Sequence, residues 1–242
     1  MLEIKIPLLV VSAAGLHFSV TPPTARPPAK ERLKPTGWEL LAPWVHHLVK
    51  GIYWSFTLSE AAVAYAAINP PSPLSRSIIR FLVRSPNPNA VVAQVGRLSP
   101  AFFAGCCFSI TGALLRNHCY RVLGRFFTFE LSIRKEHKLV TSGPYSIVRH
   151  PSYTGALCVA AGIALCHLNR HSWLVACSGL FPTTPDRVTR AVVGAWACLS
   201  IIANRAFVNR MKKEDAMLER AFGDEWRRWV ERVPYRVIPW VY

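Results

Sequence analysis

Acidic residues are scarce in this sequence. Its 242 residues include 13 Asp and Glu against 29 Lys and Arg, which gives a formal net charge of +16. Charged residues of either sign make up only 17% of the chain, 51% of the residues are hydrophobic, and the mean hydropathy is positive. That balance is unusual for a soluble domain. It favours a membrane protein, because several apolar runs approach the ~20 residues that cross a bilayer.

Several other signatures are missing. None of the seven cysteines belongs to a C-x-x-C pair and nearly all lie in apolar runs, so we expect neither a zinc site nor a disulfide framework. No Ser-His-Asp or Cys-His arrangement indicates nucleophilic catalysis, and there is no internal repeat. The basic residues lie mainly in the linkers between apolar runs. This distribution fits anionic lipid headgroups better than nucleic acid, which is not an expected partner.

The apolar runs predict a bundle of about five membrane spans. The first run is interpreted as a retained span, although a cleaved signal peptide would look similar. The fourth and fifth runs are both short and are expected to form a helical hairpin. In chain order, the runs are 6–20, 44–69, 98–115, 153–168, 172–181 and 191–208.

Some residues inside these runs have specific structural consequences. Lys50 and Glu60 interrupt the second run, and charges in such positions are expected to face the bundle interior or to snorkel. Gly105 and Gly112 in the third run would permit a second helix to pack closely. The last run should continue as one helix over 190–221, about 48 Å long, before Gly223 ends it.

Basic residues are more frequent in 21–43, 116–152 and 210–242 than in 70–97 and 169–190. The positive-inside rule therefore places the first three segments on the cytosolic side. Two segments with unusual polar chemistry thus lie on one side of the predicted bundle.

The first of these is "LVTSGPYSIVRHPSYTG", residues 139–155. Its prolines and glycines impose turns, and a segment so constrained holds its side chains with little entropic loss on binding. Tyr145, His150 and Tyr153 lie in it, and His137 just precedes it. Composition alone leaves an alternative, a rigid interfacial loop with tyrosine anchors and a snorkelling Arg149.

The second segment contains Arg210 and Glu214, which share one face of the predicted last helix because they are four residues apart. They could present a cation and an anion to a zwitterionic cofactor or an anionic substrate. The alternative is an ordinary ion pair on a solvated helix, because Lys212, Lys213 and Asp215 crowd the same turn.

These segments carry a family resemblance. "HKLVTSGPYSIVRHPSYTG" resembles the cofactor-binding signature of isoprenylcysteine carboxyl methyltransferases, and the tail "NRMKKEDAMLERAFGDEWRRWVERVPYRVIPWVY" resembles their C-terminal signature. The resemblance implies methyl transfer from S-adenosylmethionine to the C-terminal carboxylate of prenylated cysteine in CaaX-type proteins. It also implies a multi-pass protein of the endoplasmic reticulum membrane whose active site faces the cytosol.

The resemblance also implies roles for individual residues. Arg210 would bind the substrate carboxylate and be the catalytic residue. Glu130 stands where the family places a glutamine that contacts the cofactor, and a carboxylate cannot donate hydrogen bonds as an amide can. The remaining residues of the implied S-adenosylmethionine site are His137, Lys138, Leu139, Val140, Tyr145, His150, Pro151, Ser152, Tyr153 and Glu214.

We therefore expect an all-α, polytopic membrane helix bundle with a cytosol-facing cofactor pocket formed by the 116–152 region and the C-terminal tail. Residues 1–115 would supply N-terminal spans and 116–242 the methyltransferase core. Three alternatives stay open: a phospholipid or amine N-methyltransferase of the same superfamily, an NADPH-dependent sterol reductase with a similar tail, and a membrane scaffold with an inactive site.

Overall fold

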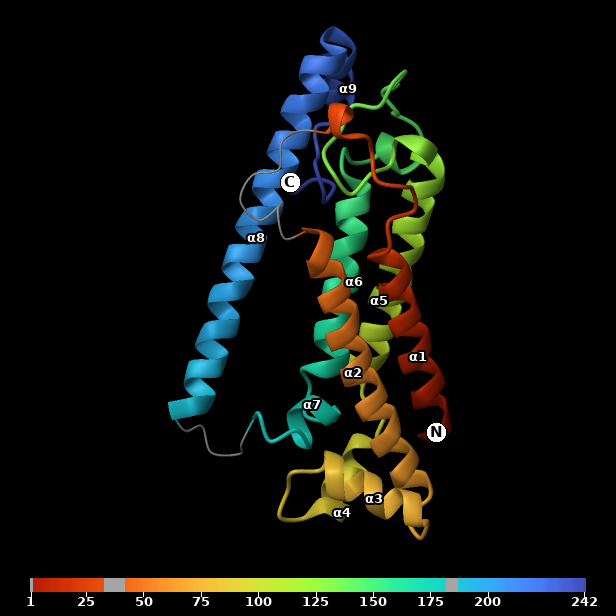
Figure 1. Cartoon of the computed structure of the whole chain (residues 1–242), viewed down its shortest axis with the longest axis vertical. Helices are drawn as coiled ribbons and strands as arrows, with labels where there is room; N and C mark the ends of the chain where they lie inside the picture. The colour runs from red at the N-terminus through yellow and green to blue at the C-terminus, as the bar shows by residue number, and fades with distance from the viewer. Residues whose placement is uncertain (1, 33–41, 182–186) are drawn as a thin grey trace.

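The structure, a computed structural model, describes residues 2–32, 42–181 and 187–242, which fold into helices joined by loops (Figure 1). Within these ranges the backbone forms no strand, and the isolated antiparallel bridge between Arg32 and Ser132 is the only β-type pairing. The predicted all-α class is thereby confirmed for the described part of the chain. Residues 33–41 and 182–186 of the predicted loops lie outside the described residues.

Four helices lie alongside one another as a bundle: α1 (Leu2–Ser19), α2 (Ala42–Ile68), α5 (Pro100–Leu123) and α6 (Pro151–His167) (Figure 1). One end of the bundle is covered by the short helices α3 (Pro73–Leu82), α4 (Pro88–Val95) and α7 (Trp173–Ala176). The long helix α8 (Arg187–Phe222) runs along the side to the opposite end, where α9 (Asp224–Arg232) follows it.

Most of the predicted apolar runs coincide with helices. The first four runs are helical as predicted, but the second arm of the expected hairpin is only the single turn α7. α5 extends beyond its run to Leu123, so the predicted division between 115 and 116 falls within this helix. The long last helix is confirmed. It ends at Gly223, whose φ of 53° is a left-handed conformation that favours glycine and stops the helix.

α5 and α6 pack at very short range through glycines. A Cβ at Gly112 would lie 2.5 Å from the Gly155 carbonyl oxygen, and a Cβ at Gly162 would lie 2.6 Å from the Gly105 carbonyl oxygen. Any side chain at these positions would push the helices apart. The predicted role of Gly105 and Gly112 is confirmed, and their partners on α6 are also glycines. This packing fixes the beginning of α6, which carries part of the candidate site.

The bundle interior contains a fully buried charged cluster. Glu60 on α2 is 2.7 Å from Lys5 Nζ on α1, and its other oxygen is 3.2 Å from His167 Nδ1 at the end of α6. The side chains of Lys5 and Glu60 are 1% and 0% exposed. Glu60 therefore faces the interior as predicted. Lys50 is half-buried and donates to the Thr21 hydroxyl.

A helix crosses a bilayer only if it is long enough and apolar enough. Within the described residues no single helix is long and apolar enough to cross a bilayer. The helices Pro88–Val95 and Pro100–Phe126, which meet at a bend of 48°, have sufficient length and apolar composition when taken together. The number of spans stays a prediction.

Candidate active site

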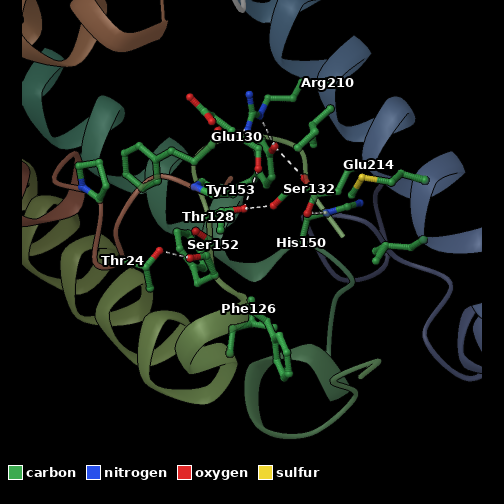
Figure 2. A pocket seen from close by; sticks show the side chains of 18 of the residues that line it. Thr24, Phe126, Thr128, Glu130, Ser132, His150, Ser152, Tyr153, Arg210 and Glu214 are labelled. Atoms are coloured by element: carbon green, nitrogen blue, oxygen red, sulfur yellow. Dashed lines mark hydrogen bonds and ion pairs between the residues drawn. The ribbon is translucent and has the colours of Figure 1, made fainter. Parts of the chain in front are cut away.

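A cavity of about 600 Å³ lies where α8, the end of α5 and the loop between α5 and α6 meet (Figure 2). Its walls also include the segment after α1, the beginning of α2 and a tryptophan of α9. The volume is within the range of about 300–1,000 Å³ typical of small-molecule sites. Segments far apart in the sequence are thus brought around one space.

All but one of the predicted site residues line this cavity. The exception is Pro151, which begins α6 and is fully buried in the protein. Whether these residues contact a cofactor stays a prediction, but their convergence is a property of the fold. The predicted residues in the lining are Glu130, His137, Lys138, Leu139, Val140, Tyr145, His150, Ser152, Tyr153, Arg210 and Glu214.

The segment 139–155, here called the rigid loop, is held in place by side chains buried in the protein. Its 3₁₀ turn Gly143–Ser146 places Tyr145 in a cluster with Cys119 of α5 and Trp229 of α9. The Trp229 indole donates to the Tyr145 carbonyl oxygen at 3.2 Å. Tyr145 and Arg149 are only 7% and 6% exposed. The alternative of exposed tyrosine anchors and a snorkelling Arg149 therefore does not describe this loop.

The C-terminal tail is hydrogen-bonded directly to the loop. The backbone N–H groups of Arg149 and His150 donate to the carbonyl oxygens of Tyr235 and Arg236, at 2.9 and 2.7 Å. About one helical turn after His150, the Thr154 hydroxyl donates to the Val237 carbonyl oxygen at 2.6 Å. The loop motif and the tail motif are therefore in direct contact. These hydrogen bonds fix the N-terminal end of α6 against the tail.

Arg210 and Glu214 are both hydrogen-bonded to the hydroxyl of Tyr153. Arg210 Nε donates to the Tyr153 hydroxyl at 2.8 Å, and that hydroxyl donates to Glu214 Oε2 at 2.9 Å. A further guanidinium nitrogen of Arg210 donates to the Phe129 carbonyl oxygen. Figure 2 shows these side chains from α6 and α8 around the same cavity. Arg210 is half-buried in a cavity wall, whereas a purely surface pair would be solvated.

His137 lies in an aromatic part of the lining. Its ring stacks on Phe126 at a centroid distance of 4.7 Å and an interplanar angle of 18°, and Phe222 approaches its edge. Burial and the nearby charge of Arg134 lower the pKa of His137. The lower pKa favours the neutral ring, which can take part in stacking and hydrogen bonding without adding charge.

Glu130 also lines the cavity, but its carboxylate has protein partners. Arg26 Nε is 2.6 Å from Oε1 and Arg32 Nη1 is 3.4 Å from Oε2. Both arginines come from the segment after α1, to which the sequence assigned no function.

Comparison with known proteins finds a family similarity in the middle of the chain. Residues 104–186 match the model of the Isoprenylcysteine carboxyl methyltransferase (ICMT) family. The family resemblance inferred from the loop is thereby confirmed. The ICMT match covers α5, the rigid loop and α6, which supply most of the predicted cavity residues before α8.

Curated proteins show a similarity of the same kind. The chain is 32% identical over 134 residues to protein-S-isoprenylcysteine O-methyltransferase B of Arabidopsis thaliana, covering 54% of this chain and 55% of that protein. It is 28% identical over 129 residues to the protein-S-isoprenylcysteine O-methyltransferase of Schizosaccharomyces pombe, covering 52% and 45%. The chain thus spans about half the length of the curated relatives it matches.

One residue that organises this candidate site was not selected from the sequence. Asp215 is 5% exposed, its Oδ1 accepts from His150 Nε2 at 2.9 Å, and its Oδ2 accepts from Arg236 Nε at 3.0 Å. Arg149 Nη2 lies 3.6 Å from the same carboxylate. Asp215 thus fixes the His150 ring and joins α8 to both the loop and the tail. The acidic pair in the tail motif was the signal, but only Glu214 was selected from it.

The carboxyl of Asp215 is stabilised in its charged form. Burial alone would raise its pKa, but the hydrogen bond and charge of His150, the charge of Arg149 and the hydrogen bond of Arg236 outweigh burial and lower the pKa. Because the folded-state pKa lies below the unfolded one, this contribution to stability is complete above about pH 4. It is lost as the pH falls through the folded-state pKa.

We expect Asp215→Asn to lower the free energy of unfolding by about 1–1.5 kcal/mol at pH 7, the difference between a charged and a neutral hydrogen bond. The difference between variant and wild type should shrink toward pH 3, because the wild-type carboxyl is then being protonated. The measurement is unfolding of both proteins in detergent at the two pH values. Asp224→Asn, at a side chain that is 83% exposed, is the matched control. A difference that does not depend on pH would contradict this role.

Proposed function

We propose that this chain is a membrane methyltransferase that transfers a methyl group from S-adenosylmethionine to the C-terminal carboxylate of prenylated cysteine in proteins. The observation that carries the proposal is the convergence of Arg210, Tyr153 and Glu214 on one cavity, with the rigid loop forming its wall. The names of the matched relatives support the reaction class. They favour neither the sterol reductase nor the N-methyltransferase alternative.

The residues of the cavity fit a cofactor with both cationic and aromatic parts. Glu214 is 29% exposed and supplies an anion that can pair with a cationic group or accept from a hydroxyl. Phe126 and His137 supply flat aromatic surface. Arg149 also lines the cavity, and its buried Nε makes no hydrogen bond among the described residues. The wall therefore contains a donor that a polar ligand could satisfy.

S-adenosylmethionine, when bound, would supply an electrophilic methyl group. The acceptor needs no general base, because a C-terminal carboxylate has a pKa of about 3.5 and is ionised at neutral pH. The role of the protein is then to orient the acceptor and to replace the water around it. Arg210 is suited to orientation, because a guanidinium binds a carboxylate through a planar pair of donors. Its bonds to Tyr153 and Phe129 hold that group in place.

The lining of the cavity also includes apolar side chains that a prenyl chain could contact. Among them are Val45 and Val49 of α2 and Phe207 of α8, which lies three residues before Arg210. Each buried CH₂ of a prenyl chain contributes about 0.8 kcal/mol. We propose that the prenyl chain enters from the bilayer, with about five spans in the endoplasmic reticulum membrane and the cavity on the cytosolic side. The basic residues of 116–152 and 210–242 support that orientation.

Ligand binding and product analysis test this proposal together. We expect the detergent-solubilised protein to bind radiolabelled S-adenosylmethionine in a saturable manner, with no competition from NADPH. A short farnesyl-cysteine acceptor should become labelled as a methyl ester, which releases methanol in base. NADPH binding, or label that resists base because it is on nitrogen, would contradict the proposal.

A further inference from the structure

Residues 20–32, here called the N-terminal strap, connect α1 to the candidate site. The strap begins where Arg116 Nε and the Tyr120 hydroxyl donate to the Ser19 carbonyl oxygen, at 2.8 and 2.5 Å. The other end of the same Arg116 guanidinium donates to the Ser152 carbonyl oxygen at 2.9 Å. The beginning of the strap is therefore tied to a residue that lines the cavity.

The strap then runs beside the segment 127–134 and is bound to it repeatedly. The Thr24 hydroxyl donates to the Phe127 carbonyl oxygen at 2.6 Å, and Figure 2 labels Thr24 among the residues that line the cavity. At the C-terminal end of the strap, the Ile133 N–H donates to the Glu31 carbonyl oxygen at 3.2 Å. Arg32 and Ser132 form an isolated antiparallel β-bridge there. Glu130 lies in the segment between these contacts, and both of its arginine partners belong to the strap.

The strap forms part of the cavity wall. Its contribution is mainly apolar, and it faces the same space as Arg210 and Glu130. The strap residues in the lining are Val20, Pro22, Thr24, Ala25, Arg26 and Pro27. Because Glu130 directly follows Phe129, whose carbonyl oxygen accepts from Arg210, the strap contact and the Arg210 contact are made by adjacent residues.

The charge of Glu130 gives a second reason for its pairing with Arg26 and Arg32. A cavity that accepts an anionic carboxylate contains two carboxylates of its own, Glu130 and Glu214. Unpaired, Glu130 would repel the acceptor, because like charges a few ångströms apart are unfavourable in a cavity of reduced dielectric. Arg26 and Arg32 neutralise it where it stands. The glutamine that the family resemblance implies at this position would need no such partners.

We propose that Glu130 is a positioning residue for the acceptor and not a cofactor contact. Through Arg26 and Arg32 it holds the N-terminal strap against the segment 127–134, which completes the acceptor side of the cavity and keeps Phe129 in register with Arg210. This inference rests on the proposed function for the identity of the acceptor. The strap contacts themselves do not depend on it.

The test compares Glu130→Gln, Arg26→Gln and the double variant in the full-length protein. We expect each single change to raise KM for a short farnesyl-cysteine acceptor about two- to fivefold, as for loss of one largely exposed ion pair, with kcat within about twofold. The double variant should be no worse than the poorer single variant, because both remove the same contact. Arg26→Lys should restore much of the loss, since it keeps the charge.

Two further measurements need no turnover. Hydrogen exchange in residues 20–32 should become faster in Glu130→Gln and Arg26→Gln, and the affinity for S-adenosylmethionine alone should stay within about twofold. Arg227→Gln is the matched control, because Arg227 is 60% exposed, pairs with Glu219 on the surface and lies outside the cavity lining. It should change none of these quantities.

The outcomes separate the two proposals. A fall in S-adenosylmethionine affinity with unchanged acceptor KM and unchanged exchange would make Glu130 a cofactor contact and overturn the inference. Unchanged exchange and unchanged KM would do the same, because the strap would then be held without Glu130. If wild-type protein forms no methyl ester, the proposed function fails, while faster exchange in the variants would still support the strap contact.

Discussion

Replacing Arg210 with alanine should lower kcat/KM for a farnesyl-cysteine acceptor by about ten- to hundredfold. This corresponds to the loss of a charge-assisted hydrogen bond of about 1.5–3 kcal/mol to the acceptor carboxylate. The structure supports an effect of this size, because Arg210 is half-buried in the cavity wall and already held by Tyr153 and Phe129. A solvated ion pair four residues apart on a helix would contribute only about 0.3–0.5 kcal/mol.

The conservative change tests geometry separately from charge. Arg210→Lys should retain part of the activity, because an ammonium keeps the attraction but lacks the planar pair of donors. Affinity for S-adenosylmethionine should change little in either variant, because Glu214 remains in place. Arg205→Ala is the control, since Arg205 lies exposed on the same helix and outside the lining of the cavity. Near-wild-type turnover in Arg210→Ala would remove this residue from the site.

Replacing Glu60 with alanine should destabilise the protein by about 3–5 kcal/mol. The cost arises because Lys5 would lose its counter-ion in an interior where it is 1% exposed. Lys5 also donates to the His171 carbonyl oxygen at 3.2 Å, so the cluster joins α1, α2 and the turn before α7. His167 would lose its carboxylate partner as well. The free energy of unfolding in detergent is the quantity to measure.

Removing both charges distinguishes an unpaired charge from lost packing. The double variant Lys5→Met/Glu60→Leu should be far closer to wild type than Glu60→Ala, because apolar residues of similar volume often replace a buried ion pair at little or no cost. The cavity lies near the other end of the bundle, so S-adenosylmethionine affinity should be preserved in protein that remains folded. A double variant as unstable as Glu60→Ala would mean that shape, and not charge, governs this cluster.

Several features could be predicted from local sequence alone. Apolar runs of the right length become α1, α2, α5 and α6, because helix formation depends on residues three and four apart and on turn signals at each end. The long α8 and its end at Gly223 follow from the same rules. Prolines and glycines between the runs also identified the loop that forms the cavity wall.

Other features depended on pairs that are distant in the sequence. Glu130 meets Arg26 across 104 residues and His150 meets Asp215 across 65, and no periodicity or motif spacing connects such positions. Pro151 belongs to the loop motif but is buried as the first residue of α6, because the same short motif must both start a helix and line a cavity.

The sequence by itself determined that the chain is helical, which loop and tail residues carry polar chemistry, and that Gly105 and Gly112 allow close packing. Only the tertiary structure decided that the tail bonds to Arg149 and His150 through its backbone, that Asp215 orients His150, and that the N-terminal strap closes one side of the cavity. The physical reason is that helices and turns are specified by neighbouring residues. A binding site is specified by which distant segments the packed helices bring into hydrogen-bonding range.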